Sequence, residues 1–139
     1  MVFEGKILGF VPTRDAELAR RFYEGVLGMR LVSDDQFALV MDAGGTTIRI
    51  VRVGEFTPAA YTILGWEVRG IAEVVARMTQ AGVQMERYGF PGQGDDGIWN
   101  APGGAKVAWF KDPDGNVLSV SEHGGGAAQV TGSELVETG

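Results

Sequence analysis

The side chains in this sequence that could support catalysis or metal binding include carboxylates that lie close together in pairs. Three pairs stand out, namely Asp34-Asp35, Asp95-Asp96, and Asp112 with Asp114. Adjacent residues seldom direct both carboxylates at one proton or one metal ion, so the first two pairs are interpreted as solvated loops. The third pair lies in the run Asp-Pro-Asp-Gly-Asn, whose proline, glycine and asparagine are what a tight turn needs. We therefore interpret it as a turn.

Histidine and cysteine chemistry is almost absent. The sequence has no cysteine, which excludes thiolate nucleophiles, disulfides and cysteine-ligated metal sites. Its single histidine, His123, precedes three glycines and lacks the rigid support that a catalytic base needs, so we expect a surface residue. The glycine-rich segment 90–104 contains no Gly-Lys-Ser/Thr sequence and is interpreted as a loop over a pocket or at an interface.

Three tryptophans and one arginine are the best candidates for binding an organic ligand. An indole offers a large stacking face, although core packing is the more frequent role of any single tryptophan. Of Trp66, Trp99 and Trp109, we favour Trp99 because its neighbours are typical of a loop. Arg49 is central in an apolar strand, where strict alternation puts it on the face opposite Ile48 and Ile50.

Bulk composition excludes several classes of protein. A chain of 139 residues with 45% hydrophobic and 22% charged residues is typical of one folded globular domain. The net charge of −6 opposes binding to nucleic acid. Apolar runs have only the length of strands, and the N-terminus has no signal-peptide cleavage site, so we expect no membrane association and a cytoplasmic location.

The pattern of apolar residues predicts the order of elements that must position these side chains. A strand at 5–13 is followed by a helix at 15–27, which Asp15 caps and Gly28 ends. Three short strands follow, at 30–33, 37–42 and 46–53. The first module, residues 5–53, is therefore predicted to be βαβββ.

The same order is predicted a second time in residues 60–123. The expected elements are a strand at 61–68, a helix at 71–81, an extended segment at 83–88, the glycine-rich segment, and a hairpin of strands at 106–111 and 117–122. Ile7-Leu8-Gly9-Phe10 is similar to Ile63-Leu64-Gly65-Trp66 at an offset of 56 residues. We infer an internal duplication within one domain, residues 1–123, and a flexible tail at 124–139.

The duplicated order, Phe22-Tyr23 with Leu27-Gly28, and Phe110 before the Asp-Pro-Asp-Gly-Asn turn together resemble the glyoxalase, bleomycin-resistance and extradiol-dioxygenase superfamily, whose members have the vicinal oxygen chelate fold. The resemblance implies an α+β protein in which two βαβββ modules form a curved mixed sheet around a cleft. It also assigns the family's metal-ligand positions to Leu8, Arg49, Ile63 and Ser119. Two apolar side chains, one hydroxyl and one cation are a poor donor set for a divalent ion.

The residues at those positions favour a protein that binds a small organic molecule without a metal or other cofactor, similar to the family's drug-sequestering members. Such a site would be an apolar cleft with a polar end, because Arg49 and Ser119 can form hydrogen bonds. The resemblance further implies a homodimer. The predicted ligand-binding residues are Leu8, Arg49, Ile63, Trp99, Trp109 and Ser119.

Two other functions stay open at this point. A metal-dependent lyase, isomerase or dioxygenase of the same superfamily could recruit ligands such as Glu67, Asp112 or His123. A cofactor-free enzyme could use Arg49 to stabilise negative charge while Glu67 acts as base. The acidic composition favours a cationic ligand and Arg49 an anionic one, so the charge of the ligand stays open too.

Overall fold

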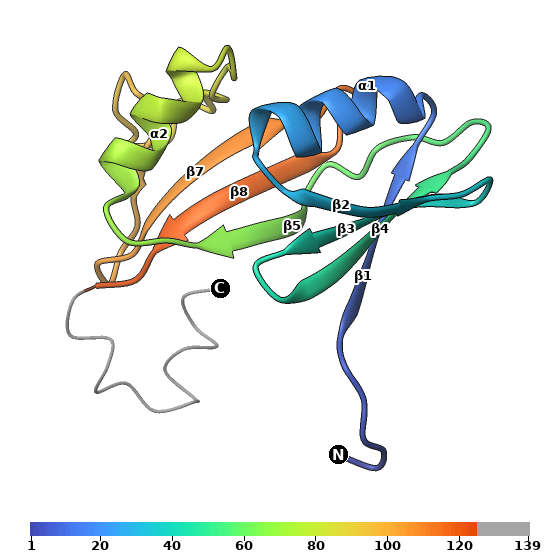
Figure 1. Ribbon diagram of the computed structural model, residues 1–139. Coiled ribbons are helices and arrows are strands. Elements are labelled where there is room, and N and C mark those ends of the chain that lie inside the picture. The colour runs from blue at the N-terminus through green and yellow to red at the C-terminus, as the bar shows by residue number, and fades with distance from the viewer. Residues whose placement is uncertain (125–139) are drawn as a thin grey trace. The chain divides into compact units, whose positions relative to one another are not determined.

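The computed structural model describes residues 1–124, which form two four-stranded sheets, each with a helix packed against it (Figure 1). The chain divides into two compact units. The first contains residues 1–64 and 112–117, and the second contains residues 65–111 and the described chain from 118. No helix within residues 1–124 is long and apolar enough to cross a membrane.

The first sheet has the strand order β1-β4-β3-β2. Its strands are β1 (Leu8–Thr13), β2 (Arg30–Asp34), β3 (Ala38–Ala43) and β4 (Thr46–Arg52). β1 runs parallel to β4, and the other neighbours are antiparallel, so the sheet is mixed. Alternate residues of β3 and β4 are buried, among them Leu39 opposite Ile50 and Met41 opposite Ile48. These side chains form the core beneath the helix.

The first helix begins as α1 (Ala16–Arg20) and continues as a π-helical turn, η1 (Arg21–Val26). Asp15 caps it as expected, since its carboxylate accepts a hydrogen bond from Leu18 N at 3.2 Å. The π-helical turn was not predicted, because its pattern of apolar residues is that of an α-helix. It holds Tyr23, which is fully buried.

The second sheet repeats the same relative order as β5-β8-β7-β6. Its strands are β5 (Thr62–Glu67), β6 (Trp99–Asn100), β7 (Lys106–Lys111) and β8 (Val117–Glu122). Helix α2 (Ile71–Gln80) buries Ile71 and Val75, and the buried side chains of the sheet include Ala108, Phe110, Leu118 and Val120. The repeated order confirms an α+β fold built from a duplicated arrangement.

Two details of the expected repeat are wrong. The helix caps Asp15 and Gly70 lie 55 residues apart, and β1 and β5 begin 54 residues apart at Leu8 and Thr62, so the elements do not keep the offset of 56 taken from the short similarity of the first strands. The segment 83–88 forms only an isolated bridge from Met85 to Phe110, and the strand that occupies the place of β2 is β6, inside the glycine-rich segment. The predicted tail lies outside the described residues except for Gly124.

Candidate functional site

Each sheet has one face that packs against its helix and one that points away from it, which we call the open face. In β7, Ala108 and Phe110 are buried while Val107 and Trp109 are partly exposed, so these two point to the open face. β6 pairs Trp99 with Val107, which places Trp99 on the same face. The open face of the second sheet therefore carries two of the predicted ligand-binding tryptophans.

The third tryptophan lies on the other side of its strand. Trp66 stacks on buried Phe110 with ring centroids 6.4 Å apart, so it belongs to the helix side of the sheet. Strand alternation then places Ile63 on the open face of β5. In the turn that closes the β7–β8 hairpin, Asp112 N donates to the carbonyl of Asn116, so these two residues are paired. Three residues away from the turn along each strand, the same antiparallel register places Ser119 opposite Trp109.

Four aromatic rings touch one another on this open face. We call Tyr88, Phe90, Trp99 and Trp109 the aromatic cluster. The centroid of Trp109 is 5.4 Å from Tyr88, 5.8 Å from Phe90 and 6.0 Å from Trp99. Tyr88 and Phe90 are 5.5 Å apart, as are Phe90 and Trp99. These separations are typical of favourable aromatic pairs, so the rings support one another.

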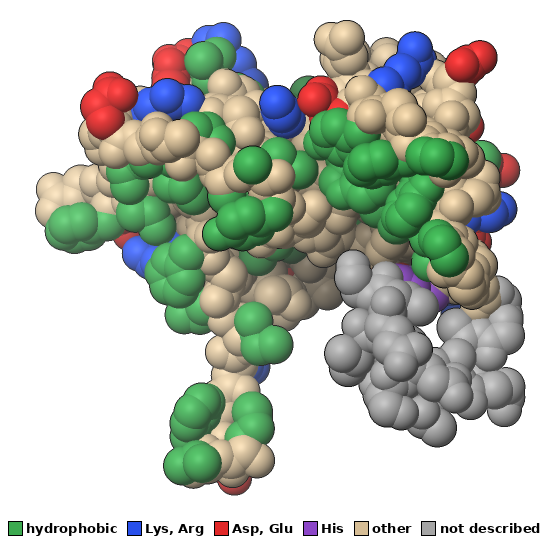
Figure 2. Space-filling model, turned by 180° about the vertical axis from the view of Figure 1, so that it is seen from behind, with side chains coloured by type: hydrophobic (Ala, Val, Ile, Leu, Met, Phe, Trp, Pro, Cys, Tyr) green, Lys and Arg blue, Asp and Glu red, His purple; other side chains and the backbone are tan. Residues whose placement is uncertain are grey.

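The aromatic cluster remains accessible to solvent. Tyr88 is 43% exposed and Phe90 is 42% exposed, and both tryptophans are partly exposed. Hydrophobic side chains gather on the second unit, at the right of Figure 2. Clustered aromatic side chains that stay exposed in this way are a common feature of binding surfaces. Sequence reasoning missed Tyr88 and Phe90, although their spacing of two residues beside a glycine-rich loop could have drawn attention to them.

Hydrogen-bond donors at the aromatic cluster are only partly used. The indole Nε1 of Trp99 donates to the carbonyl of Pro91 at 3.0 Å. Within the described chain, the indole Nε1 of Trp109 and the hydroxyls of Tyr88 and Ser119 make no hydrogen bond. Burial chiefly, and the nearby charge of Glu86 secondarily, raise the pKa of Tyr88, which keeps its hydroxyl protonated. The open face thus offers free donors beside apolar rings.

Leu8 and Arg49 lie on the open face of the first sheet. Leu8 is 51% exposed, and Phe10, opposite Arg49 in the parallel pair of β1 and β4, is 61% exposed. The guanidinium of Arg49 forms no hydrogen bond or ion pair with the residues that the structure describes. Its charge is still felt by Asp35, whose pKa is lowered mainly by backbone N–H groups of Ala38 and Phe37 and less by Arg49.

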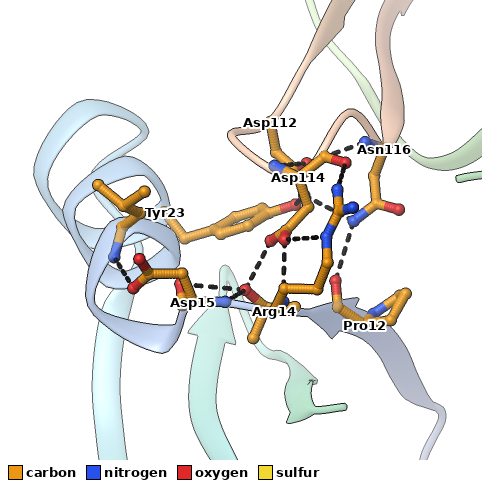
Figure 3. Close-up of polar contacts among 9 residues, drawn as sticks. Pro12, Arg14, Asp15, Tyr23, Asp112, Asp114 and Asn116 are labelled. Carbon is orange, nitrogen blue, oxygen red and sulfur yellow. Dashed lines mark hydrogen bonds and ion pairs between the residues drawn. The ribbon is translucent and has the colours of Figure 1, made fainter. Parts of the chain in front are cut away.

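The Asp-Pro-Asp-Gly-Asn run forms the predicted turn, and Figure 3 shows the polar contacts of its side chains. Both of its carboxylates are buried. Asp112 Oδ2 accepts hydrogen bonds from Tyr23 Oη at 2.6 Å and Asn116 Nδ2 at 2.9 Å. Asp112 Oδ1 accepts two backbone N–H groups of the turn itself. Asp114 accepts from Thr13 Oγ1 at 2.5 Å and from Arg14 N at 2.8 Å. Both carboxylates are therefore engaged in the structure of the first unit.

The donors present do not fit the divalent ion that the family resemblance implies. The resemblance assigns the metal-ligand positions to Leu8, Arg49, Ile63 and Ser119, and of these only the hydroxyl of Ser119 could coordinate a cation. No three side chains of histidine, cysteine, aspartate or glutamate converge anywhere in residues 1–124. Of the other ligands considered, Asp112 already accepts four hydrogen bonds, and His123 Nε2 lies 3.4 Å from Ser121 Oγ.

A hollow of about 990 Å³ lies beside α2 and contains none of the predicted ligand-binding residues. Its walls are small residues of α2, such as Ala72 and Ala76, together with polar residues of the following segment. Aromatic side chains do not line it, and its acidic residues Asp95 and Asp96 are exposed. The aromatic cluster is the better candidate, since it combines a large apolar surface with directed donors.

Comparison with known proteins agrees with this fold. The sequence model of the Glyoxalase/Bleomycin resistance protein/Dioxygenase superfamily matches residues 7–120, so the chain belongs to this superfamily. No curated protein matches the sequence.

Solved structures with this fold include proteins of different function. TnmS3, an antibiotic binding protein from Streptomyces sp. CB03234, is 24% identical with a TM-score of 0.66, covering 89% of this chain and 99% of that one. A lactoylglutathione lyase from Agrobacterium tumefaciens is 16% identical with a TM-score of 0.66, covering 85% and 92%. A glyoxalase family protein from Enterococcus faecalis is 20% identical with a TM-score of 0.66, covering 88% and 100%. At these identities the likeness shows the fold alone.

Proposed function

We propose that this protein binds an uncharged, planar aromatic molecule on the aromatic cluster of the second sheet, without a metal ion or other cofactor. The observation that carries the proposal is the set of four touching rings, two of which expose more than two fifths of their surface. Covering apolar surface contributes about 25 cal/mol per Å², and a flat ligand covers such rings most completely.

The polar groups at the aromatic cluster favour a ligand with hydrogen-bond acceptors. Trp109 Nε1 can only donate, and Tyr88 and Ser119 carry hydroxyls that can donate. None of the four rings carries a charge, so the cluster provides no ion-pair partner for an anionic group, and its free N–H and O–H donors suit an acceptor better than a cation. A carbonyl or ether oxygen on a planar ring system would satisfy these donors, and the protein would discriminate against the same ring without the oxygen.

Several parts of the proposal come from the family. TnmS3, which shares this fold, is an antibiotic binding protein, and this makes sequestration of a small molecule a reasonable role for the present chain. Leu8, Arg49 and Ile63 stay predicted ligand contacts. The homodimer also stays a prediction, which light scattering of the purified protein would check, and so does the cytoplasmic location.

The test is a titration of tryptophan fluorescence with 9-fluorenone, which is flat and carries one carbonyl, and with fluorene, which lacks it. We expect 9-fluorenone to bind more tightly than fluorene. We expect Trp109→Ala to weaken its binding about tenfold or more, which corresponds to about 1.4 kcal/mol. Phe37→Ala is the matched control, because this ring is 65% exposed but lies outside the second sheet. Equal affinity of wild type and Trp109→Ala would refute the proposed site.

A further inference from the structure

The side chain of Gln93 lies at the centre of the loop that carries three rings of the aromatic cluster. Its Oε1 accepts hydrogen bonds from Tyr88 N at 2.8 Å and Gly89 N at 3.1 Å. Its Nε2 donates to the carbonyl of Glu86 at 3.1 Å and to that of Gly97 at 2.9 Å. A primary amide has two acceptor sites and two donor hydrogens, so all four of its hydrogen bonds are made within this loop.

These four bonds connect the two arms of the loop. One arm runs from Glu86 through Tyr88 to Phe90, and the other runs from Gly97 to Trp99. The backbone of Gln93 adds a hydrogen bond to the carbonyl of Phe90 at 3.0 Å and a bridge to Trp99. The arms contain no regular strand beyond the two residues of β6, so a ladder of backbone hydrogen bonds does not fix them.

We propose that Gln93 is a positioning residue for ligand binding, which acts by holding Tyr88, Phe90 and Trp99 in one arrangement around Trp109. The inference rests on the proposed function of the aromatic cluster. A loop that is ordered before the ligand arrives loses less conformational entropy on binding, so an interaction that orders it raises affinity without touching the ligand. Only one orientation of the amide satisfies two N–H groups on one side and two carbonyls on the other.

The decisive variant is Gln93→Glu, studied in the full-length protein at several pH values. At neutral pH its carboxylate places an oxygen against the carbonyls of Glu86 and Gly97, so two hydrogen bonds become repulsive contacts. We expect the near-UV circular dichroism of the tryptophans to fall and the Kd of 9-fluorenone to rise roughly tenfold. Acidification protonates the carboxylate and returns one donor, so the signal and the affinity should recover in part.

Two control proteins separate the effect of a carboxylate at position 93 from general effects of pH and charge. Wild type is measured at each pH, because the Gln93→Glu variant alone should gain affinity as the pH falls. Gln84→Glu makes the same change of charge at an exposed glutamine of the same segment that bonds to none of the rings, and we expect wild-type behaviour from it. If Gln93→Glu does not fold, Gln93→Met replaces the amide by an uncharged side chain of similar length, and we expect a reduced near-UV signal and weaker binding.

The possible results separate the two proposals. If the folded Gln93 variants keep the near-UV signal and affinity of wild type, or if acid restores nothing in Gln93→Glu, Gln93 is not a positioning residue. If wild type fails to bind 9-fluorenone, the proposed function is wrong. The near-UV signal of the ligand-free variants then decides alone whether Gln93 orders the rings.

Discussion

Asp112 shows how a residue that could do chemistry can instead be fully engaged in structure. The sequence predicted a turn at Asp-Pro-Asp-Gly-Asn, and Gly115 adopts a φ of 88° there, which a glycine accepts without strain. The sequence could not predict that the carboxylates would be buried, because their partners Tyr23 and Thr13 lie 89 and 101 residues away. Local patterns report turns, whereas long-range partners depend on the folded chain.

Tyr23→Phe should destabilise the protein, because it removes one of the four donors to the buried carboxylate of Asp112. A buried polar group that loses a partner costs about 1–3 kcal/mol, so we expect the free energy of unfolding to fall by that amount. Urea denaturation would measure it. Tyr61→Phe is the control, since Tyr61 is 72% exposed and its hydroxyl should contribute nothing measurable. Equal losses in the two variants would contradict this role of Asp112.

The pH dependence of the same variant gives a second test. Burial, followed by the charge of Asp112, raises the pKa of Tyr23 well above its usual value. A tyrosine whose pKa is higher in the folded than in the unfolded state stabilises the folded protein. This contribution is fully present below the unfolded-state pKa of about 10, and it is lost as the pH rises through the folded-state pKa. The difference in stability between wild type and Tyr23→Phe should therefore narrow above about pH 10.

At the scale of elements, the two helices begin differently although they occupy corresponding places. Asp15 caps the first helix with its own side chain, whereas Gly70 at the start of α2 has no side chain to do so. Glu122, at the end of β8, accepts hydrogen bonds from Gly70 N at 3.1 Å and Ile71 N at 3.2 Å instead. A distant strand thus supplies the cap that the local sequence lacks.

Glu122→Gln should therefore weaken α2 in a pH-dependent way. The backbone N–H groups of Gly70 and Ile71 lower the pKa of Glu122. A glutamate whose pKa is lower in the folded than in the unfolded state stabilises the folded protein. This contribution is present above the unfolded-state pKa of about 4.3, and it is lost as the pH falls through the folded-state pKa. The melting temperature of wild type should exceed that of Glu122→Gln at pH 6, and the gap should shrink in acid. A constant gap from pH 6 to pH 3 would contradict the cap.

The loop between α2 and β7 is the part of the described chain whose conformation could not be predicted from the sequence. Helices and hairpin strands have strong periodicity, and the bounds of β7 and β8 agree with those expected. Segment 83–104 has little periodicity, and its conformation depends on side-chain bonds such as those of Gln93. Trp99 and Trp109 could be proposed from the sequence because tryptophan is itself a signal. Tyr88 and Phe90 gave only a weak signal, their spacing of two residues beside a glycine-rich loop, because their contribution depends on how the loop folds.

At the scale of the whole molecule, the duplicated fold is the part that the sequence predicts best. The order of elements recurs, and the family follows from a match over residues 7–120. Fold carries little information about ligands, since an antibiotic binding protein and a lactoylglutathione lyase share this arrangement. Function must therefore be argued from the side chains that this chain presents at its open faces.

From the side chains at the open faces we predict opposite effects of metal ions and of an organic ligand on the melting temperature. A ligand that binds only the folded state stabilises it and so raises the melting temperature. At a ligand concentration of a hundred times Kd, the stabilisation is about 2.7 kcal/mol. We expect 9-fluorenone to produce such a shift. We expect Ni²⁺, Zn²⁺, Mn²⁺ and Fe²⁺ to produce none, because the resemblance assigns the family's ligand positions to Leu8, Arg49, Ile63 and Ser119, which are poor donors for a divalent ion. Elemental analysis of protein purified without chelators provides the independent check. A stoichiometric metal that also raises the melting temperature would show that donors outside these positions form a site, and would return the chain to the metal-dependent branch of its superfamily.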